Sequence, residues 1–190
     1  MIRRKVYTKA GDDGTTGLFH GGRVAKDSDL PTAYGSVDEA QAVLALARAH
    51  AGGDLERMLV AVMQDLWVLM AELATMPANR AKLDAGVTAV SQEMVDRLEH
   101  EIDALDEQFD PPTEFVVPGG NVVAAWLDLA RTVVRRSERH ALAAAAAPSL
   151  VVPYLNRLSD LLWTMARWQE AADGSTLRVR DVGGTPPTAD

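Results

Sequence analysis

Apolar side chains recur every three or four positions through most of the chain beyond residue 31, which is the period of a helix that buries one face. The clearest stripe follows Asp54, which we interpret as a helix N-cap, and it ends before Pro77. Glycine or proline bounds the other periodic segments, because neither residue continues a helix readily. The pattern predicts five helices, at about residues 32–51, 54–76, 87–109, 121–147 and 153–174.

Short connections between consecutive helices favour an all-α fold, a five-helix antiparallel bundle of the ferritin-like up-down kind. The first thirty residues differ from the rest, because five glycines lie there among Thr, Asp and Lys without a helical period. We expect this lead segment, 1–30, to be extended and to belong to a single domain, 1–180. The last residues, 181–190, contain two prolines and two glycines and are expected to be disordered.

Composition narrows the classes of function. The net charge of -8 disfavours nucleic acid as a partner. No apolar run reaches the length of a membrane span, and no apolar signal core follows Arg3-Arg4-Lys5, so we expect a cytoplasmic protein that binds no membrane. The chain has no cysteine, and its four histidines are not spaced as ligand pairs, so no protein-bound metal is expected.

One candidate for chemistry is the run Thr8-Lys9-Ala10-Gly11-Asp12-Asp13-Gly14-Thr15-Thr16-Gly17. Glycines at every third position allow backbone N–H groups to converge on an anion, and Lys9 adds positive charge. The run is not a Walker loop, because no Gly-Lys-Ser/Thr follows at the required spacing. A flexible surface turn is the alternative interpretation.

Arginine recurs every fourth residue at Arg131, Arg135 and Arg139, with Arg136 and Glu138 beside this row. Residues at this spacing share one side of a helix, where stacked like charges repel by about 0.2–0.5 kcal/mol per pair. The row therefore needs an anionic partner, either carboxylates on a neighbouring helix or a polyphosphate.

A third polar group lies in Asn156-Arg157-Leu158-Ser159-Asp160, where the first and last residues share a helix face beside an apolar stripe. Asparagine within a helix is a modest helix former, which indicates a polar task. A hydrogen bond between helices is the simpler explanation of this group.

Taken together, these motifs resemble the PduO-type ATP:cob(I)alamin adenosyltransferases, and they occur in family order along the chain. The resemblance implies a homotrimer with active sites between adjacent subunits and an N-terminal nucleotide-binding segment. Such an enzyme moves the 5′-deoxyadenosyl group of ATP to the cobalt of reduced cob(I)alamin and releases triphosphate. The matching stretches are Lys5-Val6-Tyr7-Thr8-Lys9-Ala10-Gly11-Asp12-Asp13-Gly14-Thr15-Thr16-Gly17, Arg23-Val24-Ala25-Lys26, Tyr34-Gly35-Ser36-Val37-Asp38-Glu39, Phe115-Val116-Val117-Pro118-Gly119-Gly120, Ala130-Arg131-Thr132-Val133-Val134-Arg135-Arg136-Ser137-Glu138-Arg139 and Tyr154-Leu155-Asn156-Arg157-Leu158-Ser159-Asp160.

The resemblance also implies roles for individual residues. Arg131, Arg135, Asp38 and Phe115 would form the catalytic set, with Asp38 paired to Arg131 across the subunit boundary. An aromatic side chain at Phe115 would exclude the lower axial ligand of cobalt, which eases reduction to Co(I). ATP would be the co-substrate, with Mg²⁺ held by its phosphates, and cobalamin the second substrate. The nucleotide-binding residues implied in the same way are Thr8, Lys9, Gly11, Asp12, Gly14, Thr15, Thr16, Gly17, Arg23, Lys26, Arg135, Arg136, Glu138, Arg139 and Asn156.

Three positions depart from the family pattern, since Gln41, Asp128 and Trp163 stand where Asn, His and Phe are usual. Asp128 lies three residues before Arg131 and is close enough on a helix to compete for it. A corrinoid-binding or carrier paralogue with weak transferase activity is therefore an alternative function. A helical scaffold, whose arginine row is answered by the acidic third helix, is another. A reductase or a cobalamin-dependent enzyme is an expected partner.

Overall fold

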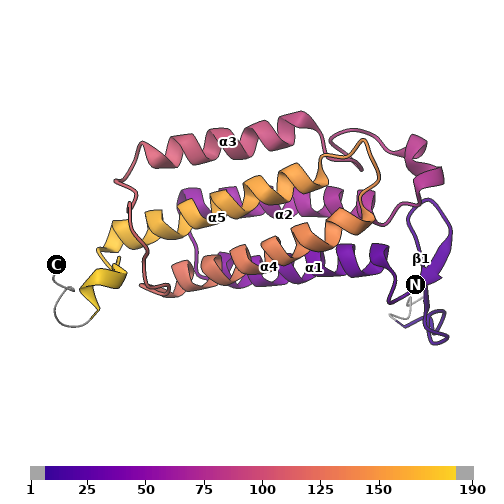
Figure 1. Cartoon of the computed structure of the whole chain (residues 1–190), viewed down its shortest axis with the longest axis horizontal. Coiled ribbons are helices and arrows are strands. Elements are labelled where there is room, and N and C mark those ends of the chain that lie inside the picture. The colour runs from indigo at the N-terminus through magenta and orange to yellow at the C-terminus, as the bar shows by residue number, and fades with distance from the viewer. Residues whose placement is uncertain (1–6, 183–190) are drawn as a thin grey trace, which may run out of the picture.

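The computed structural model describes residues 7–182, and within that range the all-α five-helix bundle is confirmed. Five long helices run alongside one another in alternating directions (Figure 1). A short antiparallel hairpin, β1 (Thr15–Gly17) and β2 (Arg23–Ala25), lies at one end of the bundle. The helices are α1 (Asp29–Arg48), α2 (Gly53–Leu73), α3 (Gln92–Asp106), α4 (Val122–Ala144) and α5 (Val151–Asp173), with short 3-10 turns η1 (Pro77–Lys82) and η2 (Val179–Asp181).

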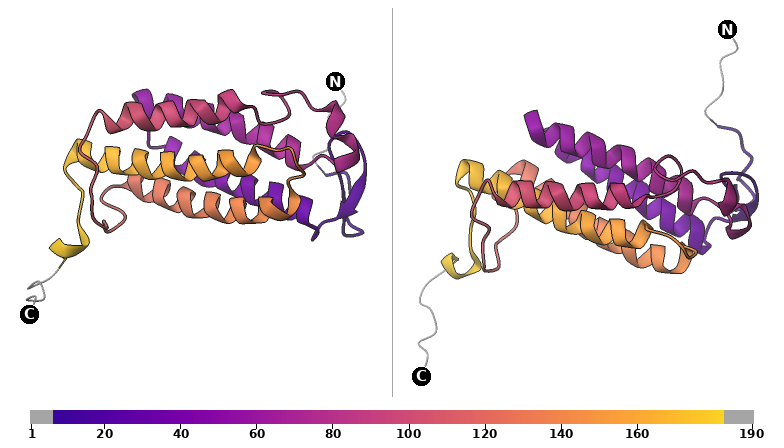
Figure 2. Two further views of the ribbon diagram at one scale, coloured as in Figure 1. Left: turned by 45° about the horizontal axis from the view of Figure 1, so that its top comes forward. Right: turned by 90° about the horizontal axis from the view of Figure 1, so that it is seen from above.

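The apolar stripes meet in one continuous core. α1 packs against α2 and α4, and α5 packs against α4 and α3, an arrangement that holds in two further views (Figure 2). Leucines from all five helices are almost completely removed from solvent, which is the main stabilisation available to an amphipathic bundle. No helix among residues 7–182 is both long and apolar enough to cross a bilayer.

Helix ends are where the sequence-based boundaries were wrong. The third helix begins at Gln92 rather than at residue 87, because the carbonyl of Asp84 accepts the N–H groups of Val87, Thr88 and Ala89 in a tight turn. The second helix begins at Gly53 with Gly52 as its N-cap, so Asp54 lies in the first turn rather than at the cap. The fourth ends at Ala144, three residues earlier than the 147 expected, because the backbone at Ala145 is extended. The tail predicted to be disordered, 181–190, is described only at its first two residues: Asp181 ends η2, and Val182 follows it. The rest of the tail lies outside the described range.

A buried carboxylate ties together the end of the bundle that carries the hairpin. Glu72, only 2% exposed, accepts hydrogen bonds from Arg80 Nη2 at 2.8 Å, the Val90 N–H at 2.7 Å and the Ser149 hydroxyl at 2.7 Å. These donors come from η1, the turn before α3 and the loop between α4 and α5. The hairpin rests on the same end, where the Phe19 N–H donates to the Ala74 carbonyl at 2.9 Å.

Replacing Glu72 should therefore loosen this end of the bundle. Glu72→Ala removes the acceptor of the Val90 N–H and of the Ser149 hydroxyl, and it leaves the partly buried Arg80 guanidinium with the Pro148 carbonyl but no carboxylate. We therefore expect the free energy of unfolding to fall by about 3–5 kcal/mol. Urea denaturation measures the change. Asp103→Ala, which removes an exposed carboxylate from α3, is the matched control and should change stability by about 0.5 kcal/mol or less. Equal effects of the two substitutions would contradict the anchoring role.

Candidate functional site

The glycine-rich run folds back on itself to start the hairpin. Gly14 adopts a φ of +81°, which only glycine reaches without strain, and its carbonyl accepts the Lys26 N–H at 2.9 Å. Arg23 crosses from β2 to donate to the Ala10 carbonyl at 2.6 Å and from Nε to the Thr15 hydroxyl at 3.1 Å. The run is thus a closed loop pinned by an arginine.

Two lysines bring positive charge to this loop. Lys26 lies close over Gly11, where an added Cβ would come within 3.1 Å of the lysine Nζ and 3.0 Å of the Thr15 carbonyl oxygen. Lys9 holds a φ of +60°, an uncommon conformation for a residue with a side chain. Hydrogen bonds from the N–H and hydroxyl of Thr15, together with Arg23, hold the pKa of Asp13 below its ordinary value, so this carboxylate is ionised at neutral pH. The remaining predicted residues of the loop, Thr8, Asp12, Thr16 and Gly17, lie in or next to the same turn and first strand.

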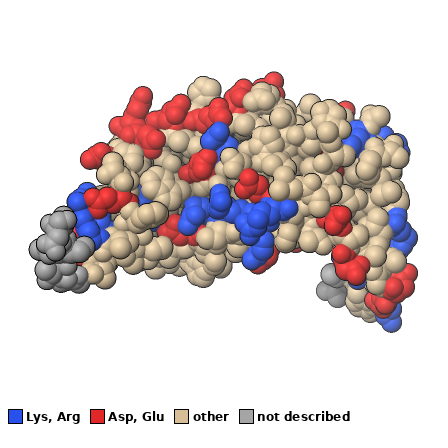
Figure 3. Space-filling model, in the orientation of Figure 1, with Lys and Arg blue, Asp and Glu red and all other residues tan. Residues whose placement is uncertain are grey.

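The arginine row lies on the outer side of α4. Positive side chains form a continuous band over the face on which α4 lies in the view of Figure 3. Arg135 and Arg139 are exposed, and within residues 7–182 neither has an ion pair; Arg139 only donates to the Arg135 carbonyl at 2.9 Å. Arg136 pairs with Glu39 of α1. Arg135 and Arg139 are therefore left without an anionic partner among residues 7–182, whereas Arg131 lies 3.5 Å from Asp128.

Neighbouring polar groups account for the other predicted residues on α4 and α5. Asn156 donates to Glu138 at 3.1 Å, which is a hydrogen bond between helices. The acidic third helix answers a different arginine, since Glu99 pairs with Arg157 at 3.0 Å. The expectation that α3 would neutralise the arginine row is wrong for the described residues.

A cavity of about 410 Å³ lies at the far end of the bundle, under the loop between α3 and α4. Phe115 forms part of its wall and is 88% exposed, so it is not a core residue. Two backbone hydrogen bonds hold its loop to the segment after α5: Val179 N–H to the Phe115 carbonyl at 2.9 Å, and Val117 N–H to the Leu177 carbonyl at 2.8 Å. Trp163, a departure from the family pattern, also lines the cavity.

Charged side chains also line this cavity, and one of them, Arg167, was not among the predicted site residues. Asp128 Oδ2 accepts from Arg167 Nη2 at 2.6 Å, while Asp128 Oδ1 lies 3.5 Å from Arg131 Nε. The expected contact between Asp128 and Arg131 is present, but a second arginine holds the same carboxylate more closely. Arg167 and its neighbour Glu170 lie on the apolar stripe of α5, and their i, i+3 spacing there was the one signal available.

Gln41, the third residue that departs from the family pattern, bonds to groups within the chain. With its amide oriented to satisfy both groups, Gln41 donates to the Met63 carbonyl and accepts from the Trp67 indole N–H, each at 3.2 Å. The side chain therefore links α1 to α2 and makes no contact with the arginine row. Asp38, one turn earlier on α1, is exposed, and its carboxylate has no ion pair or hydrogen bond among residues 7–182.

The predicted residues thus lie mainly in three places: the loop and hairpin before α1, the exposed row on α4, and the Phe115 loop between α3 and α4. Figure 1 shows the hairpin and the Phe115 loop at opposite ends of the bundle, with α4 between them. At about 1.5 Å per residue, a helix of the length of α4, 23 residues, holds its ends about 35 Å apart. One chain therefore does not bring the glycine-rich loop to Phe115.

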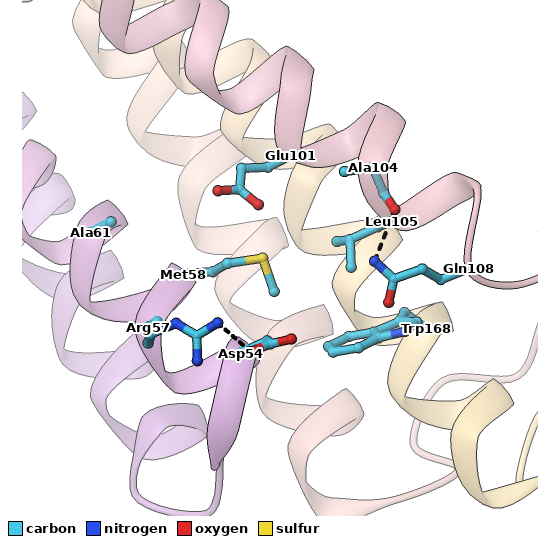
Figure 4. Close-up of a pocket in the computed structure, with 9 residues that line it drawn as sticks. All are labelled: Asp54, Arg57, Met58, Ala61, Glu101, Ala104, Leu105, Gln108 and Trp168. Atoms are coloured by element: carbon cyan, nitrogen blue, oxygen red, sulfur yellow. Dashed lines mark hydrogen bonds and ion pairs between the residues drawn. The ribbon is translucent and has the colours of Figure 1, made fainter.

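A second cavity, of about 240 Å³, lies between α2, α3 and α5 (Figure 4). Met58 and Trp168 face its interior, and Arg57 pairs with Asp54 at its edge. None of the predicted site residues lines it. Among residues 7–182, no three His, Cys, Asp or Glu side chains come close enough together to hold a metal ion.

Comparison with known proteins agrees with the motifs. The family described as cobalamin adenosyltransferase matches residues 6–169. The chain belongs to this family. A corrinoid adenosyltransferase of Mycobacterium tuberculosis (strain ATCC 25618 / H37Rv) is 41% identical to this cobalamin adenosyltransferase family member over 170 residues, which cover 86% of this chain and 87% of the relative. Another, from Citrobacter freundii, is 39% identical over 170 residues, covering 87% of this chain and 95% of the relative.

Solved structures of the family share the fold. A PduO-type ATP:corrinoid adenosyltransferase from Lactobacillus reuteri, with one phenylalanine changed to histidine and complexed with cobalamin and ATP, matches with a TM-score of 0.82 at 26% identity. The match covers 93% of this chain and 97% of that chain. A variant from the same organism with an arginine changed to lysine, complexed with ATP, gives a TM-score of 0.79 at 26% identity over 92% of this chain and 100% of that chain.

The exposure of Phe115 separates a functional from a structural role. Because its side chain is 88% exposed, Phe115→Ala should change the free energy of unfolding by about 0.5 kcal/mol or less, far below the 3–5 kcal/mol expected of a buried phenylalanine. We expect corrinoid transfer and the four-coordinate Co(II) spectrum to be lost while ATP affinity stays the same. Val87→Ala, at an exposed apolar residue outside the cavity, is the control. A large loss of stability with a normal Co(II) spectrum would refute the functional role.

Proposed function

We propose that this chain is an ATP:corrinoid adenosyltransferase that forms adenosylcobalamin from ATP and reduced cob(I)alamin. The observation that carries the proposal is the family match across residues 6–169, which includes all three groups of predicted residues on one fold. ATP and cobalamin are the two substrates, as in the complexes of the related Lactobacillus reuteri enzyme.

The active site is formed between two copies of the chain. The transferred carbon of ATP must contact cobalt, whereas α4 separates the hairpin from the Phe115 loop by roughly 35 Å within a copy. A second copy that sets its Phe115 end against the hairpin of the first removes this separation. Arg135 and Asp38 support this arrangement, because both are exposed and without a partner in the described part of one chain. The homotrimer belongs to the same proposal.

The nucleotide half consists of the hairpin loop and the arginine row. Lys9, Lys26 and Arg23 supply positive charge around a backbone turn, and Arg135 and Arg139 supply guanidinium groups that pair with phosphate oxygens in two-point contacts. Asn156 and Glu138, already bonded to each other, contact the nucleoside side. Arg136 stays paired with Glu39 and fixes the row against α1.

The reaction is a displacement at the C5′ carbon of ATP. The electron pair of Co(I) forms the Co–C bond while the C5′–O bond breaks, and triphosphate leaves with that bonding pair. Negative charge collects on the leaving triphosphate, so the cationic side chains stabilise the transition state more than the ground state. Magnesium would accompany ATP, held mainly by its phosphates, and would neutralise part of their charge.

The corrinoid half consists of the cavity beneath Phe115. An apolar side chain beneath the ring excludes the lower ligand of Co(II), and the four-coordinate ion takes up one electron more easily. That electron comes from a reductase or a small reductant in the cytoplasm. Asp38 of one copy pairs with Arg131 of the next and holds the two halves together.

A carrier that binds corrinoid but transfers slowly is the second candidate, favoured by one observation. Asp128, which replaces the usual histidine, lies 3.5 Å from Arg131 and so has access to a residue of the proposed site. Such a carrier would hold an unmodified corrinoid and pass it to a cobalamin-dependent enzyme.

Anaerobic incubation with ATP and reduced cobalamin tests the transferase directly. The visible spectrum should change to that of adenosylcobalamin, with triphosphate released in equal amount. Arg135→Ala should lower kcat/KM for ATP by about 10²-fold, as expected when one preorganised charge is removed from a leaving group. Arg48→Ala, which removes an arginine paired with Glu56 outside the proposed site, should leave the rate unchanged. No adenosylcobalamin from the unaltered chain would refute the transferase in favour of the carrier.

Assembly gives a separate test. We expect light scattering at micromolar concentration to give the mass of a trimer. Asp38→Asn should impair use of corrinoid and weaken the trimer while leaving helix content unchanged, because the exposed Asp38 carboxylate has no ion pair or hydrogen bond to the described residues, 7–182. A monomeric mass for the unaltered protein would contradict a site formed between copies.

A further inference from the structure

Asp128 lies between two arginines that compete for it. Arg167 Nη2 is 2.6 Å from Asp128 Oδ2, whereas Arg131 Nε is 3.5 Å from Oδ1 and forms no hydrogen bond with it. Arg131 and Asp128 are one turn apart on α4, while Arg167 reaches the carboxylate from α5. The shorter contact, with hydrogen-bond geometry, belongs to the arginine that the proposed reaction does not use.

Arg167 is itself enclosed. Its side chain is 2% exposed, and its Nε lies 3.0 Å from Oε2 of the fully buried Glu170. The Gly120 N–H donates to the other oxygen of Glu170 at 3.1 Å. Burial raises the pKa of Glu170, and the Arg167 guanidinium opposes that rise by favouring the charged form. The guanidinium is therefore the counter-ion of two buried carboxylates.

The turn that Glu170 holds begins just after the Phe115 loop. Gly120 fits tightly there, since a Cβ at this position would lie 2.6 Å from the Ser175 carbonyl oxygen. Ser175 leads into the segment whose residues Leu177 and Val179 bond to the Phe115 loop. Contacts made by Arg167 thus extend to Arg131 on one side and to the backbone around Phe115 on the other.

A buried carboxylate needs a counter-ion, because an unpaired charge away from water is costly. Without Arg167, the cation left beside Asp128 is Arg131, one turn along the same helix. Arg131 would then turn toward Asp128 and away from the cavity that it lines. With Arg167 in place, neither Nη of Arg131 has a partner among residues 7–182, and both stay available to the cavity.

We propose that Arg167 is a positioning residue for the corrinoid half of the site. By neutralising Asp128 it keeps Arg131 available, and through Glu170 it fixes the turn at Gly120 that supports Phe115. This role explains how the chain accommodates an aspartate where its family usually has histidine. The inference rests on the proposed function, because it takes Arg131 and Phe115 as parts of the corrinoid site.

The test compares Arg167→Met, Arg167→Lys, and each of them combined with Asp128→Asn. Asp65→Asn is the matched control, since Asp65 is a buried carboxylate bonded to Tyr154 and Arg97 outside the cavity. For every variant, KM for ATP, kcat/KM for cobalamin, the four-coordinate Co(II) spectrum with ATP bound and the melting temperature are measured.

We expect Arg167→Met to lower kcat/KM for cobalamin at least tenfold and to weaken the four-coordinate Co(II) spectrum, with KM for ATP changed less than twofold. Adding Asp128→Asn to Arg167→Met should raise kcat/KM for cobalamin at least threefold again, because the carboxylate that would pair with Arg131 is then neutral. Arg167→Lys keeps the buried charge and hence the fold, but a single ammonium group cannot hold both carboxylates as a guanidinium does, so it should show the same pattern more weakly.

A structural role would instead give equal losses in the use of ATP and of cobalamin. These losses and the fall in melting temperature would match those of Asp65→Asn, and that result would contradict a positioning role for Arg167. Absence of recovery in the Asp128→Asn double variants would also overturn the inference. If Arg167→Met does not fold, the Arg167→Lys pair decides by the same criteria. These outcomes are distinct from failure of the proposed function, in which the unaltered protein itself forms no adenosylcobalamin.

Discussion

The length of α4 is the constraint on which the rest of the account depends. Its 23 residues form one unbroken helix, packed against α1 on one side and α5 on the other, so its two ends cannot approach each other. The glycine-rich hairpin lies at one end and the Phe115 loop at the other. If the nucleotide binds at the first and the corrinoid at the second, as we propose, the chemistry requires a neighbouring copy. That copy would meet Arg135 and Asp38, whose side chains have no ionic partner among residues 7–182.

Buried charges hold each end of this rigid bundle in place. At the hairpin end, Glu72 accepts hydrogen bonds from three segments that connect the helices. At the end that carries the Phe115 loop, Arg167 pairs with two carboxylates, Asp128 and Glu170. The middle of the bundle is held by apolar packing, which is strong but tolerates sliding and repacking better than hydrogen bonds with fixed partners do. The two ends that carry the proposed half-sites are thus held by directional polar contacts at the points where the chain leaves the helices.

Helices and motifs were predictable from the sequence because each depends on residues close together in the chain. The stripe from Leu55 to Leu73 gave α2 almost to its ends, and the spacing of three arginines gave the exposed row on α4. Partners across the fold were not predictable. Neither the period of α5 nor its composition indicates that Arg167 meets Asp128, or that Glu99 pairs with Arg157 rather than with the row. Helix starts were also misplaced where a local turn, as at Asp84, took up N–H groups that a helix would have used.

Mixing two inactive variants tests most directly whether the site is shared between copies. Lys26→Ala damages the hairpin half and Phe115→Ala the corrinoid half, so each homotrimer should be inactive alone. After subunits of the two are exchanged in equal amounts, the account predicts about a quarter of the unaltered transfer rate, because one interface in four then joins an intact hairpin to an intact Phe115 loop in a closed cyclic trimer. Mixed trimers that stay as inactive as either variant alone would contradict the shared site.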